Sequence, residues 1–219
     1  MQFKTWFKKQ YLKFFLKNMD KVKIICGASN TKIDGWVSFN VDTLNITKDE
    51  DFKYFFDDKL IDNILLEHVI EHLEYKDFIV FLQIAKKYLK KGATLRIAVP
   101  DGNHPSQYAR ELTGANGTEP GADYHKYFYT IDDMTQIASQ LGFKLVKLEF
   151  FDAKGQFVCN DYNFDNGYIS RCSKNYKGRF TDNIDEYNKM INTVPIGLQE
   201  QFIKYNISYI SLFVDFIND

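Results

Sequence analysis

The chain has 219 residues, enough for one α/β domain with a full core, and one domain with an insertion accounts for this length better than two domains. Its formal net charge of -1 gives no sign of the basic surface that binds nucleic acid. Cys26, Cys159 and Cys172 have no metal-type spacing, so we expect reduced thiols in a cytoplasmic protein.

Residues 1–20 are predicted to form a basic amphipathic helix. Phe3, Phe7, Tyr11 and Phe14 share one helical face, which lysines flank. Such a helix either covers an end of the sheet or makes weak contact with an anionic membrane surface, and the scattered lysines favour the first role. No stretch approaches the apolar length that spans a bilayer, and these residues lack the uninterrupted apolar core of a secretion signal.

A predicted buried strand over residues 22–26 runs directly into the turn Gly27-Ala28-Ser29. In doubly wound α/β folds, glycine in the turn after the first strand lets the backbone approach a nucleotide-type cofactor. The next predicted strand, residues 36–41, is followed by Asp42, whose carboxylate can accept hydrogen bonds from both ribose hydroxyls. A local turn and a capping aspartate are the alternatives, but the order and separation of the two features favour a cofactor site.

Residues 44–47 are predicted to form a third short strand, and residues 48–56 a brief helix. Further elements are then expected over residues 61–66 (strand), 77–91 (helix, stopped by Gly92) and 94–99 (strand). A helical crossover makes the two flanking strands parallel, with their carboxyl ends at one edge of the sheet.

Chemically useful side chains follow both of these parallel strands. Glu67 and His68 come after the first strand, and Asp101 and His104 come after the second. Ligands of open α/β sheets bind beyond the carboxyl ends of the strands. We therefore expect these four residues to share one pocket rim.

Residues 102–129 are interrupted by glycines and prolines and are predicted to form an active-site loop. A capped helix over residues 131–141 and a strand over residues 143–151 should follow. Residues 152–205 fit neither helical nor strand periodicity and are interpreted as an insertion that covers the pocket, before a last strand over residues 209–216. The insertion carries two candidate anion clamps, Arg171 and Arg179.

Five motifs occur in a specific order: GASNTKIDGWVSFNVD, IDNILLEHVIEHL, LRIAVPDGNHP, GADYHKYFYT and DYNFDNGYISR. Together they resemble the class I S-adenosylmethionine-dependent methyltransferases, in particular a family of predicted methyltransferases from bacterial surface-polysaccharide and capsule gene clusters. The resemblance covers nearly the whole chain from Val22. It implies a single domain over residues 21–219 with a doubly wound, Rossmann-like fold, whose mostly parallel seven-stranded sheet has an antiparallel final strand.

The resemblance also implies S-adenosylmethionine as the cofactor. Gly27 and Ala28 would lie against its methionine part, Asp42 would hold its ribose hydroxyls, and Glu67 and His68 would sit beside the sulfonium. Ser29 departs from the family pattern, where many relatives have glycine. The expected cofactor set is Gly27, Ala28, Ser29, Asp42, Thr47, Glu67 and His68.

The predicted reaction is methyl transfer, most readily to an oxygen of a small anionic acceptor such as a sugar, a nucleotide sugar or a phosphoramidate-type capsule precursor. A hydroxyl acceptor needs a general base, because its pKa is high, whereas an amine needs less help. The catalytic candidates, in order of preference, are His125, His104, His68 and Asp101. The predicted acceptor-binding residues are Lys126, Tyr127 and Arg171.

The sequence leaves two alternatives to methyl transfer. His68, Glu71 and His72 match the H-x-x-E-H pattern of an inverted zinc-protease helix, but no third ligand is evident, so we predict no metal site and a hydrogen-bonding role for His72. A non-catalytic subunit that keeps the fold and binds a partner is the second alternative. Nucleic acid is excluded as a partner, and the oligomeric state stays open, with a dimer among the options.

Overall fold

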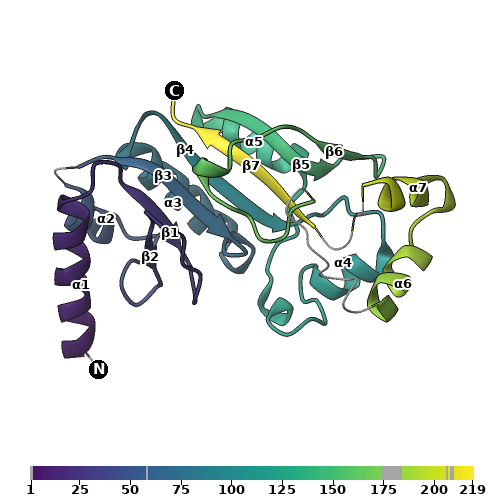
Figure 1. Cartoon of the computed structure of the whole chain (residues 1–219), viewed down its shortest axis with the longest axis horizontal. Coiled ribbons are helices and arrows are strands. Elements are labelled where there is room, and N and C mark those ends of the chain that lie inside the picture. The colour runs from purple at the N-terminus through teal and green to yellow at the C-terminus, as the bar shows by residue number, and fades with distance from the viewer. Residues whose placement is uncertain (1, 58, 174–183, 206, 208–209) are drawn as a thin grey trace.

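The computed structural model describes residues 2–57, 59–173, 184–205, 207 and 210–219 (Figure 1). The strands are β1 (Lys23–Cys26), β2 (Val37–Phe39), β3 (Ile61–Glu67), β4 (Leu89–Pro100), β5 (Lys144–Phe151), β6 (Phe157–Cys159) and β7 (Ser211–Ile217). The α-helices are α1 (Gln2–Lys17), α2 (Asp49–Phe56), α3 (Tyr75–Tyr88), α4 (Gln107–Thr113), α5 (Ile131–Leu141), α6 (Ile184–Asn192) and α7 (Ile196–Lys204), and short 3-10 turns are η1 (Ile70–His72), η2 (Ala122–Tyr124) and η3 (Phe164–Asn166).

The strands form one seven-stranded sheet in the order β2-β1-β3-β4-β7-β5-β6. β2, β1, β3 and β4 pair in parallel, whereas β7 is antiparallel to both β4 and β5. The predicted Rossmann-like fold, with a mostly parallel sheet and an antiparallel final strand, is confirmed. The carboxyl ends of β1, β2 and β3 therefore lie together at one edge.

The predicted strand over residues 44–47 is wrong. These residues form consecutive turns, in which the Leu44 amide donates to Asn40 O and the Lys48 amide donates to Asn45 O. Leu44 and Ile46 alternate with polar residues because both are buried under the turns. The sheet instead gains its seventh strand from β6, which lies in the segment interpreted as an insertion and pairs with β5.

One face of the sheet is covered by α2, α3 and α5. Their buried side chains, such as Phe52, Phe81 and Met134, join the main core with alternate strand residues. The opposite face packs against residues around η3, where Ile169 and Cys172 contact Leu65 of β3. Residues 162–172 thus follow the sheet closely and reach the carboxyl edge of β3.

The predicted N-terminal helix is present as α1 and lies beside α2 (Figure 1). Leu16 is buried in the core, and Lys9 forms an ion pair with Asp51 at 3.0 Å. Several aromatic side chains of α1, including Phe7 and Tyr11, stay exposed. Contact of this helix with a membrane surface remains a prediction, and none of the described helices has the length and apolarity to cross a membrane.

Candidate functional site

Two adjoining cavities meet at the carboxyl ends of β1 and β3, and both include Gly27 and His68 in their walls. A polar cavity of about 310 Å³ is lined by Ile25, Gly27, Ala28, Ser29, Thr31, Leu65, Glu67, His68, Ser170 and Arg171. An apolar cavity of about 350 Å³ is lined by Gly27, Val41, Leu44, Asn45, Ile46, His68, Val69, His72 and Leu73. Their volumes fall at the lower end of the range for small-molecule sites.

Gly27 is required by the geometry of the wall between the cavities. Its φ of +69° lies in the left-handed region that favours glycine, and a methyl group at its Cα would lie 2.5 Å from Val69 Cγ2. Val69 follows β3, so the turns after β1 and β3 touch at this point. The predicted glycine turn is therefore both present and sterically enforced.

Asn40 was missed by sequence reasoning, although it follows β2 directly. Its side chain accepts a hydrogen bond from the Ser29 amide at 2.8 Å and donates one to Ser29 O at 3.2 Å. These two bonds hold the turn after β1 against β2, with Ser29 at a positive φ of 48°. The sequence signal for Asn40 was a polar residue near the end of a predicted strand, two positions before Asp42.

Asp42 and Thr47 lie outside the linings of the two cavities. The Asp42 side chain is about half exposed and lies 3.8 Å from Lys8 Nζ. The Thr47 amide and hydroxyl both donate to Asn45 Oδ1. Asn45 itself lines the apolar cavity, so Thr47 acts on the cavity wall through Asn45.

Glu67 ties a distant segment to the end of β3. Its Oε1 accepts hydrogen bonds from the Ser170 amide and hydroxyl, at 2.8 and 2.6 Å, and from the Arg171 amide at 3.2 Å. Arg171 thereby lines the polar cavity, where its guanidinium lies 3.6 Å from a Glu119 oxygen. Arg179 lies outside the described residues.

His68 is the catalytic candidate that lines both cavities. Its Nδ1 lies 2.9 Å from Glu71 Oε1, and its Nε2 lies 2.9 Å from Ser211 Oγ. A carboxylate only accepts, so Nδ1 carries the proton, and in a neutral ring the lone pair is on Nε2. His68 also has φ of +56°, a rare backbone conformation that often marks a functional position.

The expected shared rim with Asp101 and His104 is wrong. Asp101 is buried, and its two carboxylate oxygens accept hydrogen bonds from the Asn103 and Phe151 amides. The His104 ring packs against Phe151 and Phe202. Neither residue lines the two cavities, because backbone amides hold the Asp101 carboxylate and the aromatic side chains of Phe151 and Phe202 hold the His104 ring.

The buried Asp101 should make stability depend on pH. Burial raises its pKa to about 7, although the Asn103 and Phe151 amides favour the ionised form. A carboxyl with a higher pKa in the folded state stabilises the fold fully below its unfolded pKa, and this contribution is lost as pH rises through about 7. We expect thermal unfolding of Asp101→Asn to show a smaller loss of stability between pH 5 and pH 8 than the parent protein. An identical pH dependence of the two proteins would contradict this.

His125 lies next to His72 rather than in the linings of the two cavities. The two rings are 4.7 Å apart at 70°, and His125 Nδ1 donates to Thr113 O at 2.8 Å. The Lys126 amide donates to the backbone of Glu71, while its ammonium pairs with Glu74 at 2.6 Å. The fold thus places His125 beside η1, and the spacing of these residues in the sequence could not predict this contact.

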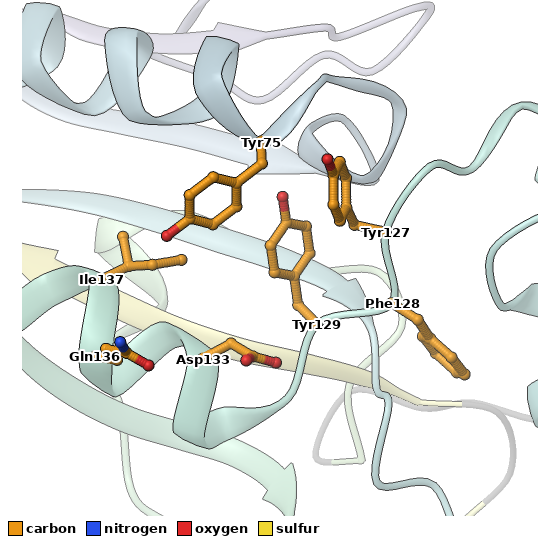
Figure 2. Close-up of a pocket in the computed structure, with 7 residues that line it drawn as sticks. All are labelled: Tyr75, Tyr127, Phe128, Tyr129, Asp133, Gln136 and Ile137. Atoms are coloured by element: carbon orange, nitrogen blue, oxygen red, sulfur yellow. The ribbon is translucent and has the colours of Figure 1, made fainter.

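Tyr127 belongs to a third cavity, of about 240 Å³, between the start of α3 and α5. Figure 2 shows the Tyr129 hydroxyl pointing between the rings of Tyr75 and Tyr127, while Phe128 turns away. The Tyr129 hydroxyl is buried with no hydrogen-bond partner among the described residues, and burial raises its pKa. This pocket is a separate aromatic subsite next to the loop.

The chain is similar to one protein family and to several solved structures. A family profile described as methyltransferase domain matches residues 16–148. Similar solved structures include a SAM-dependent methyltransferase from Archaeoglobus fulgidus, at 14% identity and TM-score 0.42, with 97% of this chain and 93% of that chain covered. A possible histamine N-methyltransferase from Thermotoga maritima is also 14% identical, with TM-score 0.40, and 70% of this chain and 83% of that chain are covered.

A third similar structure is a complex between the Trm112 methyltransferase activator and a putative methyltransferase of Haloferax volcanii. It is 9% identical with TM-score 0.45, and covers 100% of this chain and 92% of that chain. No curated protein matches the sequence significantly.

Proposed function

Because this chain belongs to the methyltransferase domain family, we propose that it transfers a methyl group from S-adenosylmethionine to an oxygen atom of a small anionic acceptor. A sugar, a nucleotide sugar or a phosphoramidate-type capsule precursor suits the cationic residues near the site. The observation that carries the proposal is the pair of cavities that meet at Gly27, at the carboxyl ends of the parallel strands.

The residues of both cavities fit the donor. Leu44 and Ile46 offer an apolar wall for the adenine, and the bare backbone of Gly27 permits close approach of the remainder. Glu67 carries the negative charge that complements the ammonium group of the donor. A side chain at position 27, or an entirely apolar lining of the polar cavity, would argue against donor binding. The described residues have neither.

The ribose is the part of the donor whose partner is least obvious, because neither the predicted Asp42 nor Asn40 lines the two cavities. We propose that Asn40, which fixes the Ser29 turn, contributes more to donor affinity than the exposed Asp42. Asn40→Ala should weaken binding of S-adenosylhomocysteine about tenfold, because two hydrogen bonds to the turn are lost. Asp42→Ala should change the affinity by less than about threefold in the same calorimetric titration. A larger loss for Asp42→Ala would restore Asp42 as the ribose ligand.

When bound, the donor supplies a methyl group on a positively charged sulfur, which an aligned nucleophile takes by in-line displacement. The chain has to position the acceptor and accept its proton. His68 is the best-placed base, because it lines both cavities and Glu71 fixes its tautomer. Its Nε2 lone pair accepts from Ser211 Oγ and would exchange this bond for one from the acceptor hydroxyl. Arg171 would bind the acid or phosphate group of the acceptor, with Lys126 and Tyr127 on the neighbouring loop.

Calorimetry with S-adenosylmethionine and S-adenosylhomocysteine tests donor binding, and a labelled-methyl assay on a panel of nucleotide sugars tests transfer. We expect both ligands to bind at one site per chain. Absence of affinity for either would refute the proposed function. Binding without transfer to any oxygen or nitrogen acceptor would favour the non-catalytic, partner-binding alternative.

A further inference from the structure

We propose that Glu71, His72 and His125 form a binding site for a divalent transition-metal ion. One potential ligand atom from each of the three residues lies within 4.8 Å of the other two. Two imidazoles and one carboxylate are the ligand set of many catalytic zinc and iron(II) sites. The set joins η1 to the loop before α5, so the fold brings together residues that are far apart in the sequence.

The buried carboxylate of Glu71 favours a positively charged partner. Its side chain is fully buried, and its Oε1 accepts a hydrogen bond from His68 Nδ1. Its Oε2 is also buried and has no hydrogen-bond partner among the described residues. An unpaired buried carboxylate oxygen is unfavourable, and a bound cation would remove this cost.

Both histidines are held as metal-binding histidines usually are. His125 Nδ1 donates to the carbonyl oxygen of Thr113, so Nε2 keeps its lone pair when the ring is neutral. His72 hydrogen-bonds to the backbone of Tyr124, which orients its ring. Glu71 is oriented in turn by His68. Each of the three ligands thus has a supporting hydrogen bond.

This site differs from the H-x-x-E-H hypothesis considered for the sequence. Residues 68–72 do not form an α-helix, and both ring nitrogens of His68 are engaged, with Glu71 and Ser211. His125 therefore takes the place of His68 in the ligand set. Ligand atoms about 2.1 Å from a tetrahedral ion are about 3.4 Å apart, so binding would draw the three groups together by at most about 1.4 Å.

Three protein ligands leave at least one position open, as in catalytic metal sites. His72 also lines the apolar cavity beside Gly27, which places the ion at the cavity wall. The open position suits an oxygen donor, such as the hydroxyl or carboxylate of an acceptor. This role rests on the proposed methyl transfer, whereas binding of the ion does not.

The test uses tag-free, chelator-treated protein, titrated with Zn²⁺ and with Co²⁺ in the absence of donor and acceptor. We expect one ion per chain and, for Co²⁺, the visible absorption of a low-coordinate site with nitrogen and oxygen ligands. Glu71→Gln and His125→Ala should each lower the affinity for Zn²⁺ at least about a hundredfold, since even supporting residues cost 10–100-fold. Asp123→Asn, an exposed carboxylate on the same loop, should bind Zn²⁺ like the parent.

An affinity for Zn²⁺ that is unchanged in both variants, or is absent from the parent protein, would overturn the proposal. Circular dichroism checks that the variants fold, and His125→Ala decides the question if Glu71→Gln does not. Binding of S-adenosylhomocysteine, measured on the same samples, separates failure of the metal site from failure of the proposed function.

Discussion

Gly27→Ala is expected to lower the affinity for S-adenosylhomocysteine at least about a hundredfold, or about 2.7 kcal/mol. The new methyl group would lie 2.5 Å from Val69 Cγ2, and valine has few rotamers with which to move away. The turns after β1 and β3 would have to separate, and these turns form the wall common to the two cavities. Isothermal titration calorimetry measures the change directly.

Gly35→Ala is the matched control. Gly35 has a similar φ of +77°, so alanine adds comparable backbone strain, but nothing lies within 4 Å of the added methyl group. It should lower the melting temperature and leave the affinity unchanged. The double variant Gly27→Ala/Val69→Ala removes the clash and should recover part of the affinity. Equal losses of affinity for Gly27→Ala and Gly35→Ala would show that the cavity wall is not the cause.

Asp215→Asn is expected to lower the free energy of unfolding by about 3–5 kcal/mol. Arg96 is fully buried on β4, and its guanidinium donates to both carboxylate oxygens of Asp215 on β7, at 2.7 and 2.8 Å. Asparagine keeps the shape of the side chain but removes its charge. The Arg96 cation would then be buried without a counter-ion, which is costly because the protein interior screens charge poorly. Chemical denaturation of the two proteins measures the difference.

The double variant Arg96→Met/Asp215→Leu tests the cause. Replacing a buried ion pair with apolar residues is often nearly neutral, so the double variant should be more stable than Asp215→Asn alone. It should still lose the bonds from Arg96 to Asn163 O and Gly167 O. A loss below about 1 kcal/mol for Asp215→Asn would show that Arg96 finds compensation elsewhere.

The sheet could be predicted because its local signals agree with the fold. The apolar run of β3 and the glycine turn after β1 are both where the sequence puts them. β6 was not predicted, because its three residues lack the alternation of buried and half-buried positions that the equally short β2 has. The error at Leu44 has a related origin, since buried turns can imitate the alternation of a strand.

The site was only partly predictable, for a different reason. Gly27, Glu67 and His68 follow strands directly, so their neighbours are set by the sheet. The positions of His104 and His125 depend on tertiary packing, against Phe202 and beside His72 respectively, which no local pattern encodes. Strand-end residues can therefore be assigned from sequence with more success than loop residues.

The hydrogen bonds that hold residues 163–171 on the sheet affect how the protein folds during synthesis on the ribosome. Arg96 donates to the carbonyl oxygens of Asn163 and Gly167 while it pairs with Asp215 of β7, and Glu67 anchors the same segment at Ser170. The first four strands of the nascent chain can thus pair before Ser170 and Arg171 complete the lining of the polar cavity. Donor affinity would be acquired only after β7 has been synthesised and has joined the sheet.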